Sequence, residues 1–132
     1  MSGLTLYLLE DLYAVCRLEA GSPLLTGSLS GELYSVTATS EEVSVVCPEG
    51  ESPPEAKCER GWRCLKVSGP LDFSQTGVLA SLAEPLAKAE IPIFVLSTYD
   101  TDYVLVKISH LDKAQAVLRE AGHLVRGFDK QE

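Results

Sequence analysis

An internal repeat with an offset of 60 residues constrains the fold of this chain more than any other feature of its sequence. Residues 33–37 (LYSVT) align with residues 93–97 (IFVLS), and residues 43–46 (VSVV) align with residues 103–106 (YVLV). The same offset places Glu42 on Asp102. Each copy has two apolar runs around a polar turn, which is typical of a β-hairpin. Two such copies in a chain of 132 residues predict two related units.

The segments around the hairpins make the two copies unequal. Segments before the hairpins align with an offset near 49 instead of 60. The first copy is therefore about 11 residues shorter before its hairpin, which corresponds to about three helical turns. The second copy has strand-like runs at 62–67, 91–98, 102–108 and 124–126, and helical periodicity at 77–90 and 109–121. This α+β order, βαββαβ, predicts a four-stranded antiparallel sheet with two helices on one face. Pro85 is expected to kink or split the first helix.

The repeat also predicts the domain organisation. We expect a truncated unit at residues 1–52, a linker rich in proline and acidic residues at 53–60, and a complete unit at 61–128. The strand-like run at 4–9 has no counterpart in the repeat. It could serve as the fourth strand of the shortened first copy. The sheets of the two units should share one hydrophobic body, because the first copy has too few helices to cover its sheet alone.

Charge and cysteine content exclude several classes of protein. A net charge of −8 disfavours nucleic acid and anionic membrane surfaces as partners. The apolar run near the N-terminus is too short for a signal peptide or a membrane span, so we expect a cytoplasmic protein with its four cysteines as thiols. The Cys and His spacings do not match a zinc site, and we expect no metal and no cofactor.

Two segments of the second copy resemble a known family. Residues 69–83 (GPLDFSQTGVLASLA) resemble the strand–loop–helix of an ACT domain, and residues 93–106 (IFVLSTYDTDYVLV) resemble its central hairpin. More narrowly, both resemble ACT proteins of the CASTOR arginine-sensor type, as do residues 34–49, and the resemblance covers about residues 10–125. It implies a ferredoxin-like ACT fold, with a truncated ACT-like unit followed by a complete one. It also implies a regulatory protein that binds an amino acid at an interface between ACT units.

The same resemblance, together with helix chemistry, indicates a binding site. The loop before the helix at 77–90 offers free N–H groups and the positive end of the helix dipole, which suit a carboxylate. Asp102, in the hairpin turn, would accept a hydrogen bond from the ligand's ammonium group. The first copy has Glu42 in the place of Asp102 and lacks the loop with Gly77, so we expect one site per chain. Gly77 either admits the ligand to the backbone or only permits the turn. The predicted site comprises Asp72, Ser74, Gln75, Thr76, Gly77, Thr98, Tyr99 and Asp102, with Pro92 and Ile93 supplied by another unit.

The identity of the ligand and the partner is less constrained. Gln75 replaces a glutamate of the arginine sensors, and Pro92 lacks an N–H, so both residues argue against arginine as the ligand. We expect a homodimer, because one complete ACT unit lacks its usual mate. The alternative is a structural dimerisation module that binds no ligand. Asp100 and Asp102 have no nucleophile or base beside them in the sequence, so we predict no catalytic residue and no enzyme.

Overall fold

The computed structural model describes residues 3–23, 31–72 and 74–127. The chain forms two compact units. We call Asp11–Trp62 the N-terminal unit, and Met1–Glu10 together with Arg63–Glu132 the C-terminal unit. The first part of the long strand β5 (Lys57–Val67) belongs to the N-terminal unit and its second part to the C-terminal unit. The division into a truncated and a complete ACT unit stays a prediction.

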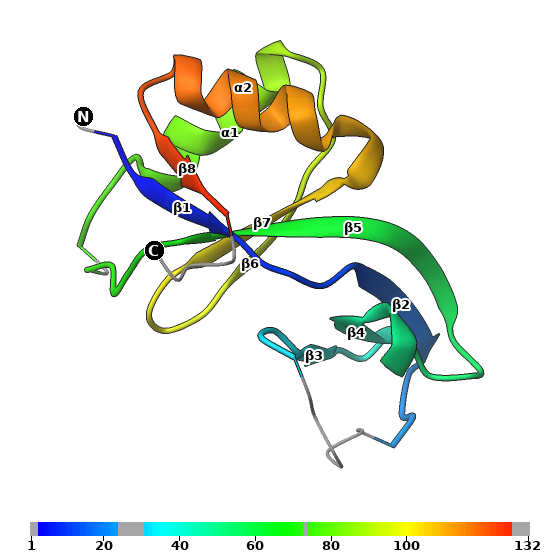
Figure 1. The fold of residues 1–132 in the computed structure, drawn as a ribbon. Coiled ribbons are helices and arrows are strands. Elements are labelled where there is room, and N and C mark those ends of the chain that lie inside the picture. Colours follow the sequence, from blue (N-terminus) through cyan, green and yellow to red (C-terminus); the bar gives the residue numbers. More distant parts are fainter. Residues whose placement is uncertain (1–2, 24–30, 73, 128–132) are drawn as a thin grey trace. The chain divides into compact units, whose positions relative to one another are not determined.

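The C-terminal unit has the expected α+β order of elements (Figure 1). After β5 come α1 (Val78–Lys88), β6 (Phe94–Ser97), β7 (Asp102–Lys107), the short helix η2 (Ile108–His110), α2 (Leu111–Glu120) and β8 (Leu124–Arg126). Figure 1 shows α1 and α2 together on one side of the strands of this unit. The fold is therefore α+β and ferredoxin-like, as the repeat predicts.

The sheet of this unit has one strand more than expected, because β1 (Thr5–Leu8) lies between β5 and β8. Leu6 pairs with Val67 in antiparallel register and with Val125 in parallel register. The strand order is β8-β1-β5-β7-β6. The idea that this run fills a place in the first copy is therefore wrong, and so is the expectation of four purely antiparallel strands. The cause is burial: Leu6 is fully buried in the core of the C-terminal unit, where Leu4 and Leu8 also pack.

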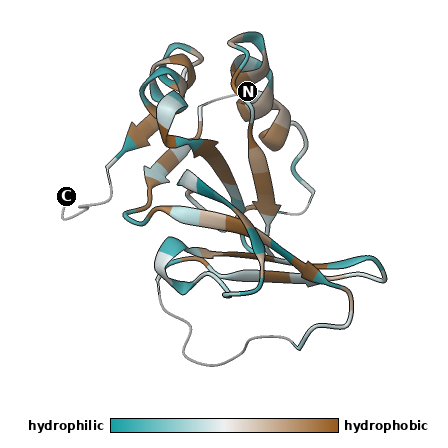
Figure 2. Cartoon of the chain, turned by 90° about the vertical axis from the view of Figure 1, so that its right-hand side faces the viewer, coloured by the Kyte–Doolittle hydropathy of each residue, from teal (hydrophilic) through white to brown (hydrophobic). Residues whose placement is uncertain are grey.

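The helices and the sheet of the C-terminal unit enclose this core. Helix α1 buries Val78, Leu82 and Leu86, and α2 buries Leu111, Ala114 and Leu118, each at the spacing of one helical face. Figure 2 shows the apolar residues gathered on the strands below the helices and on the helix faces. Leu79, also in α1, is 40% exposed.

Helix α1 continues through Pro85, so of the two expected effects a split is wrong, and a kink stays a prediction. Pro85 has no N–H to donate to the carbonyl of Ser81, four residues earlier. The imidazole Nε2 of His123 lies 2.9 Å from that carbonyl oxygen. Nδ1 of the same ring accepts a hydrogen bond of 3.0 Å from the N–H of Leu4, so the proton lies on Nε2 and is donated to Ser81. His123 thus supplies the hydrogen bond that Pro85 cannot make.

The N-terminal unit is an antiparallel sheet in the order β3-β4-β2-β5. Its other strands are β2 (Tyr13–Glu19), β3 (Ser35–Ala38) and β4 (Glu42–Pro48), and the short helix η1 (Glu49–Glu51) follows β4. Its described residues contain no α-helix. Most of the segment between β2 and β3 lies outside the described residues, so the shortened first copy stays a prediction. Lys57 and the next three residues, expected in a linker, begin β5, and Lys57, Cys58 and Glu59 pair with β2. One core cluster comprises Ala14, Cys16, Val43, Val45 and Cys47, and Tyr13, Leu33, Val46 and Trp62 are also buried in this unit.

The cysteines differ from the expectation of four thiols. A disulfide joins Cys16 of β2 to Cys58 of β5. Cys47 and Cys64 are buried and form no disulfide. The sequence could not reveal this bond, because it depends on the pairing register of two strands that are far apart along the chain.

Candidate functional site

A cavity of about 220 Å³ lies in the C-terminal unit, between the loop that precedes α1 and the turn of the β6–β7 hairpin. Its lining comes from three neighbouring pieces of backbone: the loop, the first residue of α1 and the turn. The lining residues are Leu71, Asp72, Gln75, Val78, Ser97, Thr98, Tyr99, Asp100, Thr101 and Asp102. Both walls of the cavity therefore belong to one unit of the chain.

Two hydrogen bonds tie the hairpin turn to the segment that leads into the loop. The N–H of Leu71 donates to the carbonyl of Asp100 over 2.6 Å. The hydroxyl of Thr101, only 4% exposed, donates to the carbonyl of Val67, also over 2.6 Å. A Cβ at Gly69 would lie 3.0 Å from the carbonyl oxygen of Asp100, so glycine permits this close approach. The turn and the loop are fixed relative to each other before any ligand arrives.

The loop is ordered by its own side chains. The carboxylate of Asp72 accepts a hydrogen bond from the N–H of Ser74, and this interaction lowers the pKa of Asp72. The amide oxygen of Gln75 accepts a 2.8 Å hydrogen bond from the N–H of Asp72. Because only the oxygen can accept, this contact turns the amide nitrogen of Gln75 away from that N–H. Gln75 can therefore offer an N–H donor to the cavity.

The N-terminus of α1 forms the other end of this wall. Gly77 is the N-cap residue with φ of +80°, a conformation that glycine adopts without strain. A Cβ built on Gly77 would meet nothing within 4 Å, so the backbone there is open to solvent. The first N–H groups of the helix have no partner within the helix. With the positive end of the helix dipole, they favour an anionic group such as a carboxylate.

The hairpin turn supplies the acceptors. Asp102 and Ser97 are paired across the hairpin, and the Ser97 hydroxyl donates to Oδ1 of Asp102 over 2.6 Å. The N–H of Thr98 donates to the carbonyl of Thr101 over 2.8 Å, and the hydroxyl of Thr98 also contacts this carbonyl. Asp72, Asp100 and Asp102 line the cavity, whereas none of its described lining residues is basic. The negative charge favours a ligand with an ammonium group.

The predicted site residues fall into two sets. Asp72, Gln75, Thr98, Tyr99 and Asp102 line the cavity together. Ser74, Thr76 and Gly77 lie on the same exposed loop but are not part of the lining. Pro92 and Ile93 precede β6 and do not line the cavity either, which leaves open their predicted contribution from another unit.

Sequence reasoning missed five lining residues: Leu71, Val78, Ser97, Asp100 and Thr101. The hairpin register contained a signal for Ser97, because the last residue of β6 faces the first residue of β7 across the turn. Asp100 was considered only as half of a carboxylate pair. Nothing in the sequence indicated that Thr101 is buried, since polar turn residues are usually exposed.

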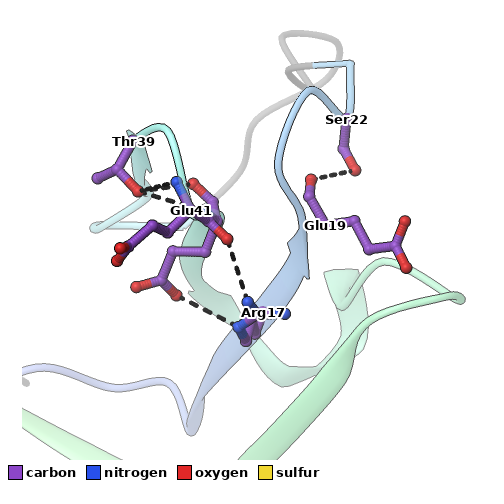
Figure 3. Close-up of polar contacts among 6 residues, drawn as sticks. Arg17, Glu19, Ser22, Thr39 and Glu41 are labelled. Atoms are coloured by element: carbon purple, nitrogen blue, oxygen red, sulfur yellow. Dashed lines mark hydrogen bonds and ion pairs between the residues drawn. The ribbon is translucent and has the colours of Figure 1, made fainter.

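The corresponding hairpin of the N-terminal unit has the same hydrogen bond at its turn. The N–H of Thr39 donates to the carbonyl of Glu42, just as the N–H of Thr98 donates to the carbonyl of Thr101. The two equivalent hydrogen bonds are 59 residues apart in the sequence. The counterpart of Asp102 is therefore the buried Val43, and its assignment to Glu42 is wrong. Figure 3 shows that Arg17 binds this turn through the carbonyl of Glu41, at 3.1 Å. Arg17 also lies 3.8 Å from a carboxylate oxygen of Glu42.

Comparison with known proteins identifies the family. The family model of the ACT domain matches residues 57–120, and a model described as an N-terminal domain matches residues 11–55. The chain is an ACT-domain protein. An Agrobacterium tumefaciens protein of known crystal structure is 34% identical to this ACT protein, with a TM-score of 0.88. The alignment covers 96% of this chain and 95% of that one, so the two proteins belong to one family.

The curated relatives are longer proteins. The cytosolic arginine sensor for mTORC1 subunit 1 of Homo sapiens is 41% identical over 46 residues, which are 34% of this chain and 14% of the sensor. The ACT protein thus matches only a small part of that sensor. The regulatory subunit of aspartate kinase from Thermus flavus has a TM-score of 0.65 at 10% identity, over 92% of this chain and 99% of that one. At that identity the likeness concerns the fold alone.

Membership of the ACT family bears on the type of function. ACT domains are regulatory rather than catalytic modules, and family membership supports a regulatory role that depends on a small molecule. Among the described residues, no helix is long and apolar enough to cross a membrane.

Proposed function

We propose that this ACT protein is a sensor that binds a free amino acid in the cavity between the loop before α1 and the β6–β7 turn. The observation that carries the proposal is the polarity of this cavity. Val78, at the N-terminus of α1, lies on one wall together with Asp72 of the loop, and Asp100 and Asp102 line the other wall. An amino acid is a zwitterion, and such a cavity offers a complementary group to each of its charges.

Each main-chain charge of the ligand has a specific partner in this proposal. The α-carboxylate accepts hydrogen bonds from the first N–H groups of α1 and from the amide nitrogen of Gln75. The α-ammonium group donates to Asp102, whose Oδ1 is already held by Ser97. This hydrogen bond orients the carboxylate before the ligand binds, which reduces the cost of ordering it.

A second copy of the chain would complete the site. Strand β6 pairs only with β7 among the described strands, so its other edge is available to another chain. We propose a homodimer in which residues near Pro92 and Ile93 of one copy close the cavity of the other. Pro92 is exposed, and Ile93 is partly buried against the core of its own unit. The dimer would then depend on the ligand, and this dependence could transmit the signal to a regulated protein.

The side chain of the ligand is constrained by Gln75. A neutral amide holds a guanidinium group less strongly than the glutamate of the resembling sensors. The likeness to the arginine sensor covers too little of that protein to carry its ligand across. We therefore propose an amino acid other than arginine and, by analogy with the cytosolic sensor, a protein of the cytoplasm.

A thermal-shift screen against the twenty amino acids tests this function. A ligand at about 100 times its dissociation constant should stabilise the chain by roughly 2.7 kcal/mol. Sedimentation with and without the ligand found in the screen then tests the homodimer. A dimer that forms without any ligand, together with no shift for any amino acid, would instead support the alternative of a structural dimerisation module.

A further inference from the structure

Cys16 and Cys58 lie directly opposite each other in the N-terminal unit. They are partners in the antiparallel register of β2 and β5, and their Cα atoms are 4.1 Å apart. This distance is near the roughly 4.5 Å of a non-hydrogen-bonded antiparallel pair, in which side chains approach each other most closely. Strand β2 also pairs with β4 along its whole length. The strand pairing therefore holds the two sulfur atoms together whether or not they are bonded.

The surroundings of Cys58 suit both redox states. Cys16 is 1% exposed, whereas Cys58 is partly exposed, so a reagent in solution reaches Cys58 first. The Sγ atom of Cys58 lies 3.8 Å from the carbonyl oxygen of Ala56. A disulfide sulfur has no proton to donate, but a reduced Cys58 thiol could donate a weak hydrogen bond to this oxygen. Reduction would thus leave a partly buried thiol with an acceptor.

The N-terminal unit is small, so a covalent link between two of its strands should matter to its stability. It spans Asp11–Trp62, and its described residues include no α-helix to cover the sheet. The core cluster around Cys16 comprises five small or medium-sized side chains: Ala14, Cys16, Val43, Val45 and Cys47. Tyr13, Leu33, Val46 and Trp62 of this unit are buried as well. Units of this size depend strongly on covalent links, because their cores bury little apolar surface. The Cys16–Cys58 bond joins positions 42 residues apart and so restricts much of the unfolded unit.

We propose that Cys16 and Cys58 form a redox switch that opens and closes in a glutathione buffer and sets the resistance of the N-terminal unit to unfolding. In a reducing compartment, where we place the chain, lasting disulfides are rare and those that form are usually transient. This inference goes beyond ligand binding and does not depend on it. Strand register and exposure carry the inference.

The oxidation step balances with glutathione disulfide as the oxidant. The thiolate of Cys58 attacks one sulfur of glutathione disulfide, forms a mixed disulfide and releases one glutathione. The thiolate of Cys16 then attacks the Cys58 sulfur, forms the Cys16–Cys58 bond and releases the second glutathione. The protein loses two electrons and two protons, and two glutathione thiols gain them.

The remaining cysteines should not take part. Burial raises the pKa of the Cys47 thiol, which keeps it protonated and a poor nucleophile. Cys64 is fully buried in the C-terminal unit. No group of three or more potential metal-ligating side chains exists in the part of the chain that the structure describes, which gives the cysteines no zinc site there.

The test equilibrates the full chain in glutathione buffers of graded ratio, blocks thiols by alkylation and maps the bonds by mass spectrometry. We expect one disulfide, between Cys16 and Cys58, half-formed within the range of cellular glutathione ratios. Limited proteolysis should cut residues 11–62 roughly tenfold more slowly in the oxidised chain than in the reduced chain. The reduced chain should keep its circular dichroism spectrum.

Two variants sharpen the result. Cys58→Ala should be cut at the rate of the reduced wild type in every buffer, whereas Cys47→Ala should keep the redox response. Because the mapping uses the wild-type chain, it remains decisive if a variant fails to fold. Four thiols at every ratio, a bond that persists in the most reducing buffer, a different cysteine pair, or equal cleavage of both forms would each overturn the proposal.

Discussion

Replacement of His123 by alanine should destabilise the C-terminal unit through the backbone of α1. His123 is 6% exposed, and its ring links two polar groups of the backbone. Nδ1 accepts from the N–H of Leu4, at the start of β1, and Nε2 donates to the carbonyl of Ser81. Alanine would leave both backbone groups without these partners.

The size of the effect follows from these two contacts. An unsatisfied buried donor or acceptor costs about 1–3 kcal/mol, so the loss of two such contacts in His123→Ala should lower the free energy of unfolding by about 2–6 kcal/mol. Pro85→Ala restores an N–H that can donate to Ser81. In that background only the contact with Leu4 is lost, and His123→Ala should cost about 1–2 kcal/mol less. Pro85→Ala alone should stabilise the chain, because proline is unfavourable inside a helix.

Urea unfolding of the wild type, the two single variants and the double variant, followed by circular dichroism, measures this coupling. We expect a coupling free energy of about 1–2 kcal/mol between positions 85 and 123. Additive effects, within roughly 0.5 kcal/mol, would refute the idea that His123 replaces the hydrogen bond that Pro85 cannot make.

Two further predictions concern Gly3 and Asp72 of the C-terminal unit. A Cβ at Gly3 would overlap the carbonyl oxygen of Gly122, so Gly3→Ala should lower the free energy of unfolding by about 1–3 kcal/mol in the same urea assay. Gly50 has open space around it, so the control Gly50→Ala should change this free energy little. The hydrogen bonds from Ser74 lower the pKa of Asp72, so its contribution to stability is present above the unfolded pKa and is lost as pH falls through the lower folded pKa. Asp72→Asn should remove this part of the acid dependence, and an unchanged acid limb in urea titrations at graded pH would contradict the assignment.

The hairpins and the helices of the complete unit could be predicted because their signals are local. Apolar alternation and turn residues lie close together in the sequence, and the repeat shows them twice. The match of Glu42 to Asp102 was wrong by one residue, since sequence similarity did not reveal where the turn begins. Only the hydrogen bonds of Thr39 and Thr98 show that the offset at the turn is 59.

The features that were missed depend on contacts between distant segments. The place of β1 depends on its pairing with both β5 and β8, and a short apolar strand carries no sign of its neighbours. The role of His123 needs both Leu4 and Ser81 to be close, and neither is near it in the sequence. The family resemblance predicted the loop and the turn of the candidate site. Ser97 and Thr101 could be assigned to the site only from the structure, in which Ser97 contacts Asp102 and Thr101 contacts Val67.

Calorimetric titration of the best-scoring amino acid into three proteins tests the proposed site most directly: the wild type, Asp102→Asn and Asp112→Asn. Asp112 is an exposed aspartate in the first turn of α2 and serves as the matched control. Loss of the charge that holds a buried ammonium group costs about 2–5 kcal/mol, so Asp102→Asn should bind roughly thirtyfold or more weakly than the wild type. Asp112→Asn should bind like the wild type. Equal affinity of Asp102→Asn and wild type would contradict the proposed role of Asp102.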